Sequence, residues 1–137
     1  MSARIYKAEK GQALAEAALV LPILLLIIMA ALTFGMMIYV KTLVVLSSSQ
    51  AARVGSSIYY DDTMTAEEKT QKIKTTAYYY LGSGISGTDR KVDIYSDGAT
   101  ISVKVTYNYK LIFPLLHEIL GNKTTIPIQY ESKFLIQ

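Results

Sequence analysis

The sequence of 137 residues has no cysteine, only one histidine, and few charged residues (18%). Without cysteine there is no disulfide, no thiolate zinc site and no cysteine nucleophile. The single histidine, His117, has no cluster of neighbouring ligands, whereas a metal site needs several correctly spaced ones. The serine run at residues 47–49 has no base to activate it. We therefore expect no catalytic residues, no metal and no cofactor, and we expect that the protein is not an enzyme.

Charge is absent from residues 17–40, and this gap is the most informative feature of the composition. As a helix, this segment spans about 36 Å, enough to cross a hydrocarbon core of about 30 Å with some tilt. A cleaved secretory signal fits less well, because the apolar run is long and no small-residue cleavage site clearly closes it. We expect an uncleaved transmembrane helix over about 17–40 that anchors the chain in the lipid bilayer.

The flanking charges predict the orientation of this helix. Arg4, Lys7 and Lys10 precede the span, and Lys41 and Arg53 follow it. This weak positive-inside bias favours a single-pass protein of the cytoplasmic membrane, with a cytoplasmic N-terminus and an extracytoplasmic C-terminal domain. Acidic and basic residues are nearly balanced beyond the span, which argues against a nucleic-acid partner because such a site needs a basic stripe.

Three segments follow from this reading. Residues 1–11 are a short basic cytoplasmic leader, residues 12–60 form the N-terminal helix that contains the span, and residues 61–137 form an extracytoplasmic α+β head. Beyond the span the helix becomes amphipathic and continues outside the membrane. We expect its packing stripe to contain the larger side chains, with Ser48 and Ser49 on other faces. The expected stripe is Leu43, Leu46, Gln50, Val54 and Ile58.

The head is predicted to hold one helix and a small antiparallel sheet. Thr65 and Glu68 have the spacing of a capping box, so a second helix begins there and stops at Gly82. Residues 82–89 read as a loop, and residues 111–120 as a loop with one helical turn. Strands are expected at 92–95, 101–109 and 126–134, with a hairpin turn at 96–98. Pro127 indicates an edge position for the last strand.

Glu16 lies at the start of the uncharged segment, and its position allows two interpretations. A carboxylate there costs free energy unless it is paired, which makes it a functional candidate. Its side chain could instead extend to the cytoplasmic headgroups beside Lys10. Pro22, inside the span, cannot donate a hydrogen bond to the carbonyl of Ala18 and is expected to kink or loosen the helix.

The N-terminal half also resembles a known family. The segment Gly11-Gln12-Ala13-Leu14-Ala15-Glu16 is similar to the processing signal of type IV prepilins. The continuation Glu16-Ala17-Ala18-Leu19-Val20-Leu21-Pro22, together with Phe34-Gly35, Tyr39 and residues 51–55, resembles the TadE-like family. These are minor pilins, or pseudopilins, of tight-adherence (Tad/Flp) pilus systems. Residues 103–107 and 114–116 are similar to the C-terminal half of the family.

The resemblance implies a pilin-like fold and a structural role in starting or tipping a Tad-type adherence pilus at the cell surface. A prepilin peptidase would cut between Gly11 and Gln12, and Glu16 and Pro22 would serve recognition and assembly. The implied partners are this peptidase, the major pilin, a second minor pilin and the inner-membrane assembly platform. The new amino group on Gln12 would pair with Glu16 and set the register of subunits.

Two other functions remain open. The chain could be a pseudopilin of a secretion or DNA-uptake system, or a membrane-anchored binding or sensor module that is never processed. The eleven tyrosines add a hypothesis about assembly, because tyrosine is favoured at protein interfaces. We expect some of them, including Tyr60 and Tyr79, to be exposed for contact between subunits.

Overall fold

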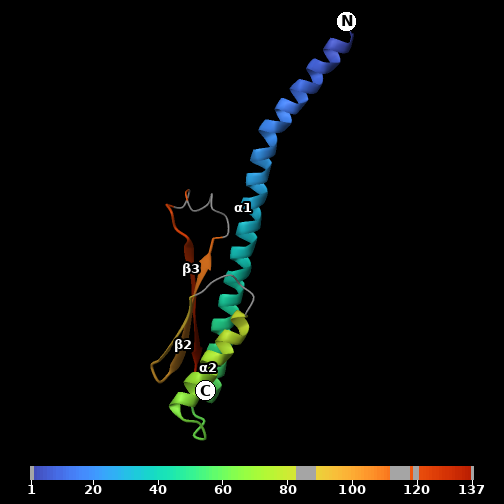
Figure 1. The fold of residues 1–137 in the computed structure, drawn as a ribbon. Coiled ribbons are helices and arrows are strands. Elements are labelled where there is room, and N and C mark those ends of the chain that lie inside the picture. Colours follow the sequence, from blue (N-terminus) through green and yellow to red (C-terminus); the bar gives the residue numbers. More distant parts are fainter. Residues whose placement is uncertain (1, 83–88, 112–117, 119–120, 137) are drawn as a thin grey trace. The chain divides into compact units, whose positions relative to one another are not determined.

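The computed structural model describes residues 2–82, 89–111, 118 and 121–136. The elements follow in the order α1 (Ser2–Ile58), α2 (Ala66–Leu81), β1 (Arg90–Ser96), β2 (Thr100–Lys110) and β3 (Thr125–Leu135) (Figure 1). A long apolar N-terminal helix, a second helix and a three-stranded antiparallel sheet confirm the predicted α+β class. The chain divides into two compact units, Met1–Gly35 and Met36–Gln137. We call the second unit the head unit.

The first unit consists of the N-terminal part of α1. We predicted that the helix begins at Gln12, but it begins at Ser2 and includes the leader segment. The leader contains no proline before Gly11 and is rich in helix-forming residues, and one glycine costs a helix only about 1 kcal/mol. The helix also continues through Pro22, so the proline does not end it.

The head unit contains the last turns of α1, and their buried face differs from the predicted stripe. Leu46 is exposed, whereas Ser48 is fully buried. The buried side chains of this part of α1 are instead mostly small: Val40, Val44, Ser47, Ser48, Ala51, Ala52 and Ile58. Small residues occupy these buried positions because they let the helix axis approach the sheet and α2 closely. At Gly55 an added Cβ would lie 2.6 Å from Ile101 Cδ1.

Three consecutive serines tie this part of α1 to three different elements. Ser47 Oγ donates to the Ala77 carbonyl of α2 at 2.7 Å, and Ser48 Oγ donates to the Val103 carbonyl of β2 at 2.6 Å. Ser49 Oγ lies 3.2 Å from Ser132 Oγ of β3. The serine ladder, residues 47–49, therefore fixes α1 against the rest of the head unit.

The helix α2 begins and ends as the sequence predicts. Thr65 Oγ1 accepts from the Glu68 N–H at 3.3 Å, while Glu68 Oε2 accepts from the Thr65 N–H at 2.8 Å, which completes the capping box. Gly82, at φ 69°, caps the C-terminus. The buried face of α2 carries Ile73, Ala77 and Leu81.

The sheet has the order β1-β2-β3, and both pairings are antiparallel. The predicted turn is confirmed: Asp97 Oδ1 accepts from the Thr100 N–H at 2.6 Å, and Gly98 has φ 86°. The alternation of β2 is confirmed too, since its odd-numbered residues Ile101, Val103, Val105, Tyr107 and Tyr109 are buried. Pro127 lies in β3, an edge strand as predicted. The predicted loop at 82–89, the segment at 111–120 and His117 lie largely outside the described residues.

Candidate processing and assembly segment

All four predicted site residues, Gly11, Gln12, Glu16 and Pro22, lie in α1. Gln12 Nε2 donates a hydrogen bond to Glu16 Oε1 at 3.2 Å, and both side chains are exposed. Residues four apart share one helix face, which explains this contact. The structure therefore brings Gln12 and Glu16 together, while Pro22 lies farther along the helix.

The segment after Glu16 presents an apolar surface. Leu19, Ile27 and Phe34 have 70%, 60% and 68% of their surface exposed, and their apolar neighbours along the helix are exposed as well. Contiguous apolar surface of this extent is unusual for a protein surface in water and marks an interaction site for a membrane or for another protein. Among the described residues, α1 is the one helix long and apolar enough to cross a membrane. This agrees with the predicted single span.

Two threonines of α1 have their hydroxyl groups satisfied within the helix. Thr33 Oγ1 donates to the Met29 carbonyl at 2.8 Å, and Thr42 Oγ1 donates to the Ile38 carbonyl at 3.0 Å. An unpaired hydroxyl in hydrocarbon would cost free energy, and this back-bonding removes the cost. The two threonines are therefore compatible with an apolar surrounding.

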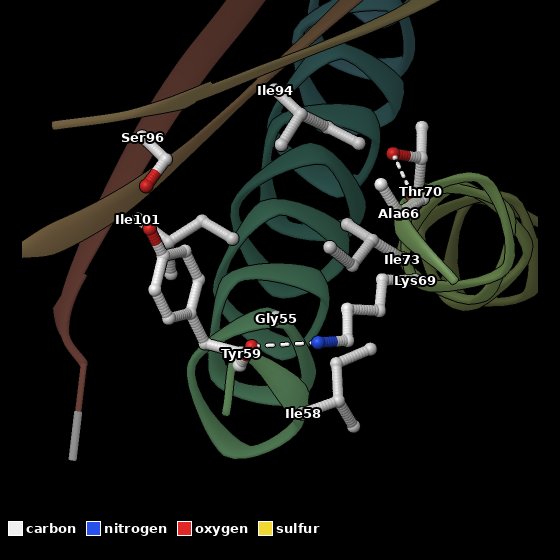
Figure 2. Close-up of a pocket in the computed structure, with 10 residues that line it drawn as sticks. All are labelled: Gly55, Ile58, Tyr59, Ala66, Lys69, Thr70, Ile73, Ile94, Ser96 and Ile101. Atoms are coloured by element: carbon white, nitrogen blue, oxygen red, sulfur yellow. Dashed lines mark hydrogen bonds between the residues drawn. The ribbon is translucent and has the colours of Figure 1, made fainter. Parts of the chain in front are cut away.

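A cavity of about 300 Å³ lies within the head unit between α1, α2 and the sheet (Figure 2). Its walls are mainly apolar, with Ile58, Ile73, Ile94 and Ile101 among them. The lysine in its lining, Lys69, donates from Nζ to the Tyr59 carbonyl at 2.7 Å. This bond joins α2 to the end of α1, so the Lys69 amine already makes a structural contact.

Among the described tyrosines, two buried and two strongly exposed side chains stand out. Tyr107 and Tyr109 are buried in the head unit, and burial raises the pKa of both phenols. Tyr79 and Tyr60 have 78% and 66% of their surface exposed. Each of the two exposed rings forms an edge-to-face pair with a sequence neighbour, with centroids 5.3 and 5.2 Å apart. Their exposure agrees with the hypothesis of subunit contacts, which stays a prediction.

Sequence reasoning missed the serine ladder as a set of contacts and the unpartnered hydroxyl of Tyr109. The hydroxyl is buried and has no hydrogen-bond partner in the part of the chain that the structure describes. The small residues at 47, 48, 51, 52 and 55 were the available signal for a closely packed helix face. Within the described ranges no three His, Cys, Asp or Glu side chains gather closely enough to hold a metal ion.

Comparison with known proteins identifies the segment that contains Gly11, Gln12 and Glu16. No curated protein and no solved structure matches the chain. The family model described as TadE-like protein matches residues 11–53, which run from the predicted cleavage glycine into the small-residue face of α1. This match confirms the family that the sequence resembles: residues 11–53 are a TadE-like segment.

Proposed function

We propose that the protein is a minor pilin, or pseudopilin, that helps to initiate or tip a Tad-type adherence pilus. Its role is structural, without an active site of its own. The observation that carries the proposal is the family match, which starts at Gly11. A prepilin peptidase cuts the precursor after this residue and removes the basic leader.

Cleavage gives Glu16 its role. It creates an α-amino group on Gln12, whose side chain already lies 3.2 Å from the Glu16 carboxylate. A carboxylate at the edge of an apolar span is costly alone, and pairing with the new cation offsets that cost. The pair forms within one subunit or between neighbours, and it fixes the register of helices that leave the membrane together.

The rest of the chain supplies an anchor and a head. The exposed apolar surface of α1 lies in the cytoplasmic membrane, with the leader in the cytoplasm and the head unit outside. The proposed partners of this subunit are the prepilin peptidase, the major pilin, a second minor pilin and the inner-membrane assembly platform.

Counting pili by electron microscopy tests the role. A strain that lacks the protein should show few pili, and the wild-type gene should restore them. The variant Glu16→Gln should fail to restore pili although its head is folded and membrane-bound. The matched control Glu9→Gln changes a carboxylate in the leader, before the cut, and should restore pili fully.

Normal piliation without the protein would contradict the proposed role. If the strain without the protein has normal pili but is defective in secretion or in DNA uptake, the protein would instead be a pseudopilin of that other machine. Full restoration by Glu16→Gln would contradict the pairing mechanism and leave the anchor as the function of α1.

A further inference from the structure

Both edges of the sheet are open in the described part of the chain. β1 and β3 each pair with β2 alone, and because both are antiparallel to β2 they run in the same direction. An open edge presents unpaired N–H and C=O groups that can pair with another strand.

The free groups of β3 follow from its hydrogen bonds to β2. Ile136 donates from its backbone N–H to the Ala99 carbonyl, and Leu111 donates to the Thr124 carbonyl. Even-numbered positions of β3 therefore face β2, and odd-numbered positions face the free edge. Pro127, which lacks an N–H, faces that edge near its beginning. The donors left beyond it are Gln129, Glu131, Lys133 and Leu135.

The free groups of β1 have the opposite parity. Asn108 of β2 donates from its backbone N–H to the Asp89 carbonyl, so odd-numbered positions face β2. The backbone groups that face the free edge belong to Arg90, Val92, Ile94 and Ser96. In a parallel pair, one residue bonds to the two neighbours of the residue opposite it. Odd positions of β3 can therefore lie opposite odd positions of β1.

The charges on the solvent face select one such register. Lys91 and Asp93 form an ion pair at 3.1 Å on β1, and Glu131 and Lys133 form one at 3.8 Å on β3. The order of charges is basic then acidic on β1, and acidic then basic on β3. When Glu131 lies opposite Lys91 of a second copy, Lys133 lies opposite Asp93 of that copy. All four charges then have an opposite charge across the strands.

Apolar side chains and a groove fit the same register. Leu135 and Tyr95, exposed by 69% and 58%, become neighbours. On the helix side, a groove of about 540 Å³ flanks the end of β3 between Arg53, Ser56, Ser57, Lys133, Phe134 and Leu135. The corresponding end of β1, at Ile94 and Ser96, is the part that α2 covers. The groove can therefore take side chains of the second copy, but it is too small for a whole helix.

A symmetric, antiparallel pairing of β3 with β3 of a second copy would also bring opposite charges together, with Glu131 opposite Lys133. In that arrangement Leu135 would lie opposite Gln129, a polar residue. In the parallel pair the exposed Leu135 lies opposite the exposed Tyr95 and gains an apolar contact, which favours the parallel pair.

We propose that β3 of one copy pairs in parallel with β1 of a second copy, with Glu131 opposite Lys91 and Lys133 opposite Asp93. This contact is heterologous, so each added copy leaves one β3 edge and one β1 edge open, and chains of copies form. This pairing depends neither on membrane anchoring nor on cleavage at Gly11.

Cysteine cross-linking of the full chain in cell membranes tests the register, since the wild type has no cysteine. Two differently tagged copies, Lys91→Cys and Glu131→Cys, should form a disulfide-linked mixed dimer on mild oxidation. Within one chain these strands are about 10 Å apart, two strand spacings, which exceeds the disulfide limit of about 7 Å. Lys91→Cys with Ser132→Cys is the matched control, since its second thiol points to the other sheet face and should not link.

A second pair of variants tests the charges. With Tyr95→Cys and Leu135→Cys as reporters, adding Lys91→Glu should lower the mixed-dimer yield by roughly threefold to fivefold, because it places like charges across the strands. Adding Glu131→Lys as well should restore the yield. Near-UV circular dichroism of each purified variant verifies that the head is folded.

Each outcome decides the proposal. A mixed dimer that depends on both thiols and follows the charge swap supports it. Efficient linkage between Glu131→Cys and Lys133→Cys copies would show symmetric β3 pairing and overturn it, as would the absence of any linkage in folded, membrane-bound variants. The amount of the chain in the membrane pellet measures anchoring separately, so that a failure of anchoring is not mistaken for a failure of strand pairing.

Discussion

Replacing Tyr109 with phenylalanine should stabilise the head unit. The side chain is 1% exposed, and its hydroxyl has no hydrogen-bond partner among the described residues. A phenol is protonated at neutral pH, and burial raises its pKa further, so this hydroxyl is a donor that needs an acceptor. An unsatisfied buried polar group costs about 1–3 kcal/mol, and Tyr109→Phe removes that cost but leaves the ring in place.

The expected gain lies near the lower end of this range, about 1 kcal/mol, because the missing oxygen leaves a small void. In a domain of this size it raises Tm by roughly 4–8 °C. Thermal unfolding of the full chain in mild detergent, followed by near-UV circular dichroism, measures the shift. The control Tyr95→Phe changes a tyrosine that is 58% exposed and should shift the free energy of unfolding by less than about 0.5 kcal/mol. A loss of about 1 kcal/mol in Tyr109→Phe would refute the reasoning.

Three further predictions concern the head unit. Ser48→Ala should lower the free energy of unfolding by about 1 kcal/mol because it loses a buried hydrogen bond, whereas Ser57→Ala, whose exposed hydroxyl bonds within α1, should change it by less than about 0.5 kcal/mol; equal effects would contradict this. Gly55→Leu should destabilise by about 1–3 kcal/mol in urea unfolding, since its Cβ has no room, while Gly35→Leu, with nothing within 4 Å, should leave the unfolding midpoint of the head unchanged. Hydrogen bonds from the backbone and side chain of Thr65 lower the pKa of Glu68 below the usual 4.5. The capping contact of Glu68 therefore stabilises the fold above pH 4.5, and this stabilisation is lost as pH falls through the lowered pKa. Glu68→Gln should flatten this part of the plot of unfolding free energy against pH, and an unchanged slope would contradict the role of Glu68.

The sequence predicts those parts of the fold that depend on local patterns. The capping box at Thr65, the hairpin turn at Asp97 and the edge position of Pro127 each follow from chemistry within a few residues, and all three are confirmed. The uncharged run predicts the apolar helix for the same reason. Local rules of this kind need no knowledge of tertiary contacts.

The packed face of α1 could not be predicted in this way. Hydropathy assigns Leu46 to the core and Ser48 to another face, but the structure exposes the leucine and buries the serine. The reason is tertiary: where an added Cβ at Gly55 would collide with Ile101, only small side chains fit, and a serine hydroxyl finds a carbonyl on another element. The distance between α1 and the sheet decides which residues fit at these positions, and the periodicity of the sequence does not report that distance.

The candidate site is predicted from a motif that is linear in sequence, and its role stays a prediction. Gly11, Gln12 and Glu16 form a motif within one helix, and the side-chain contact between Gln12 and Glu16 follows from their spacing. The open strand edges could not be found without the sheet order and the hydrogen-bond parity of β1 and β3.

The mature N-terminus tests the central claim most directly. Intact mass and terminal sequencing of the protein from its native membrane, in cells with and without the prepilin peptidase, measure it. We predict a start at Gln12 only where the peptidase is present, and loss of this start in Gly11→Leu. A start at Met1 or Ser2 in both strains would contradict the pilin pathway and leave an anchored module that is never processed.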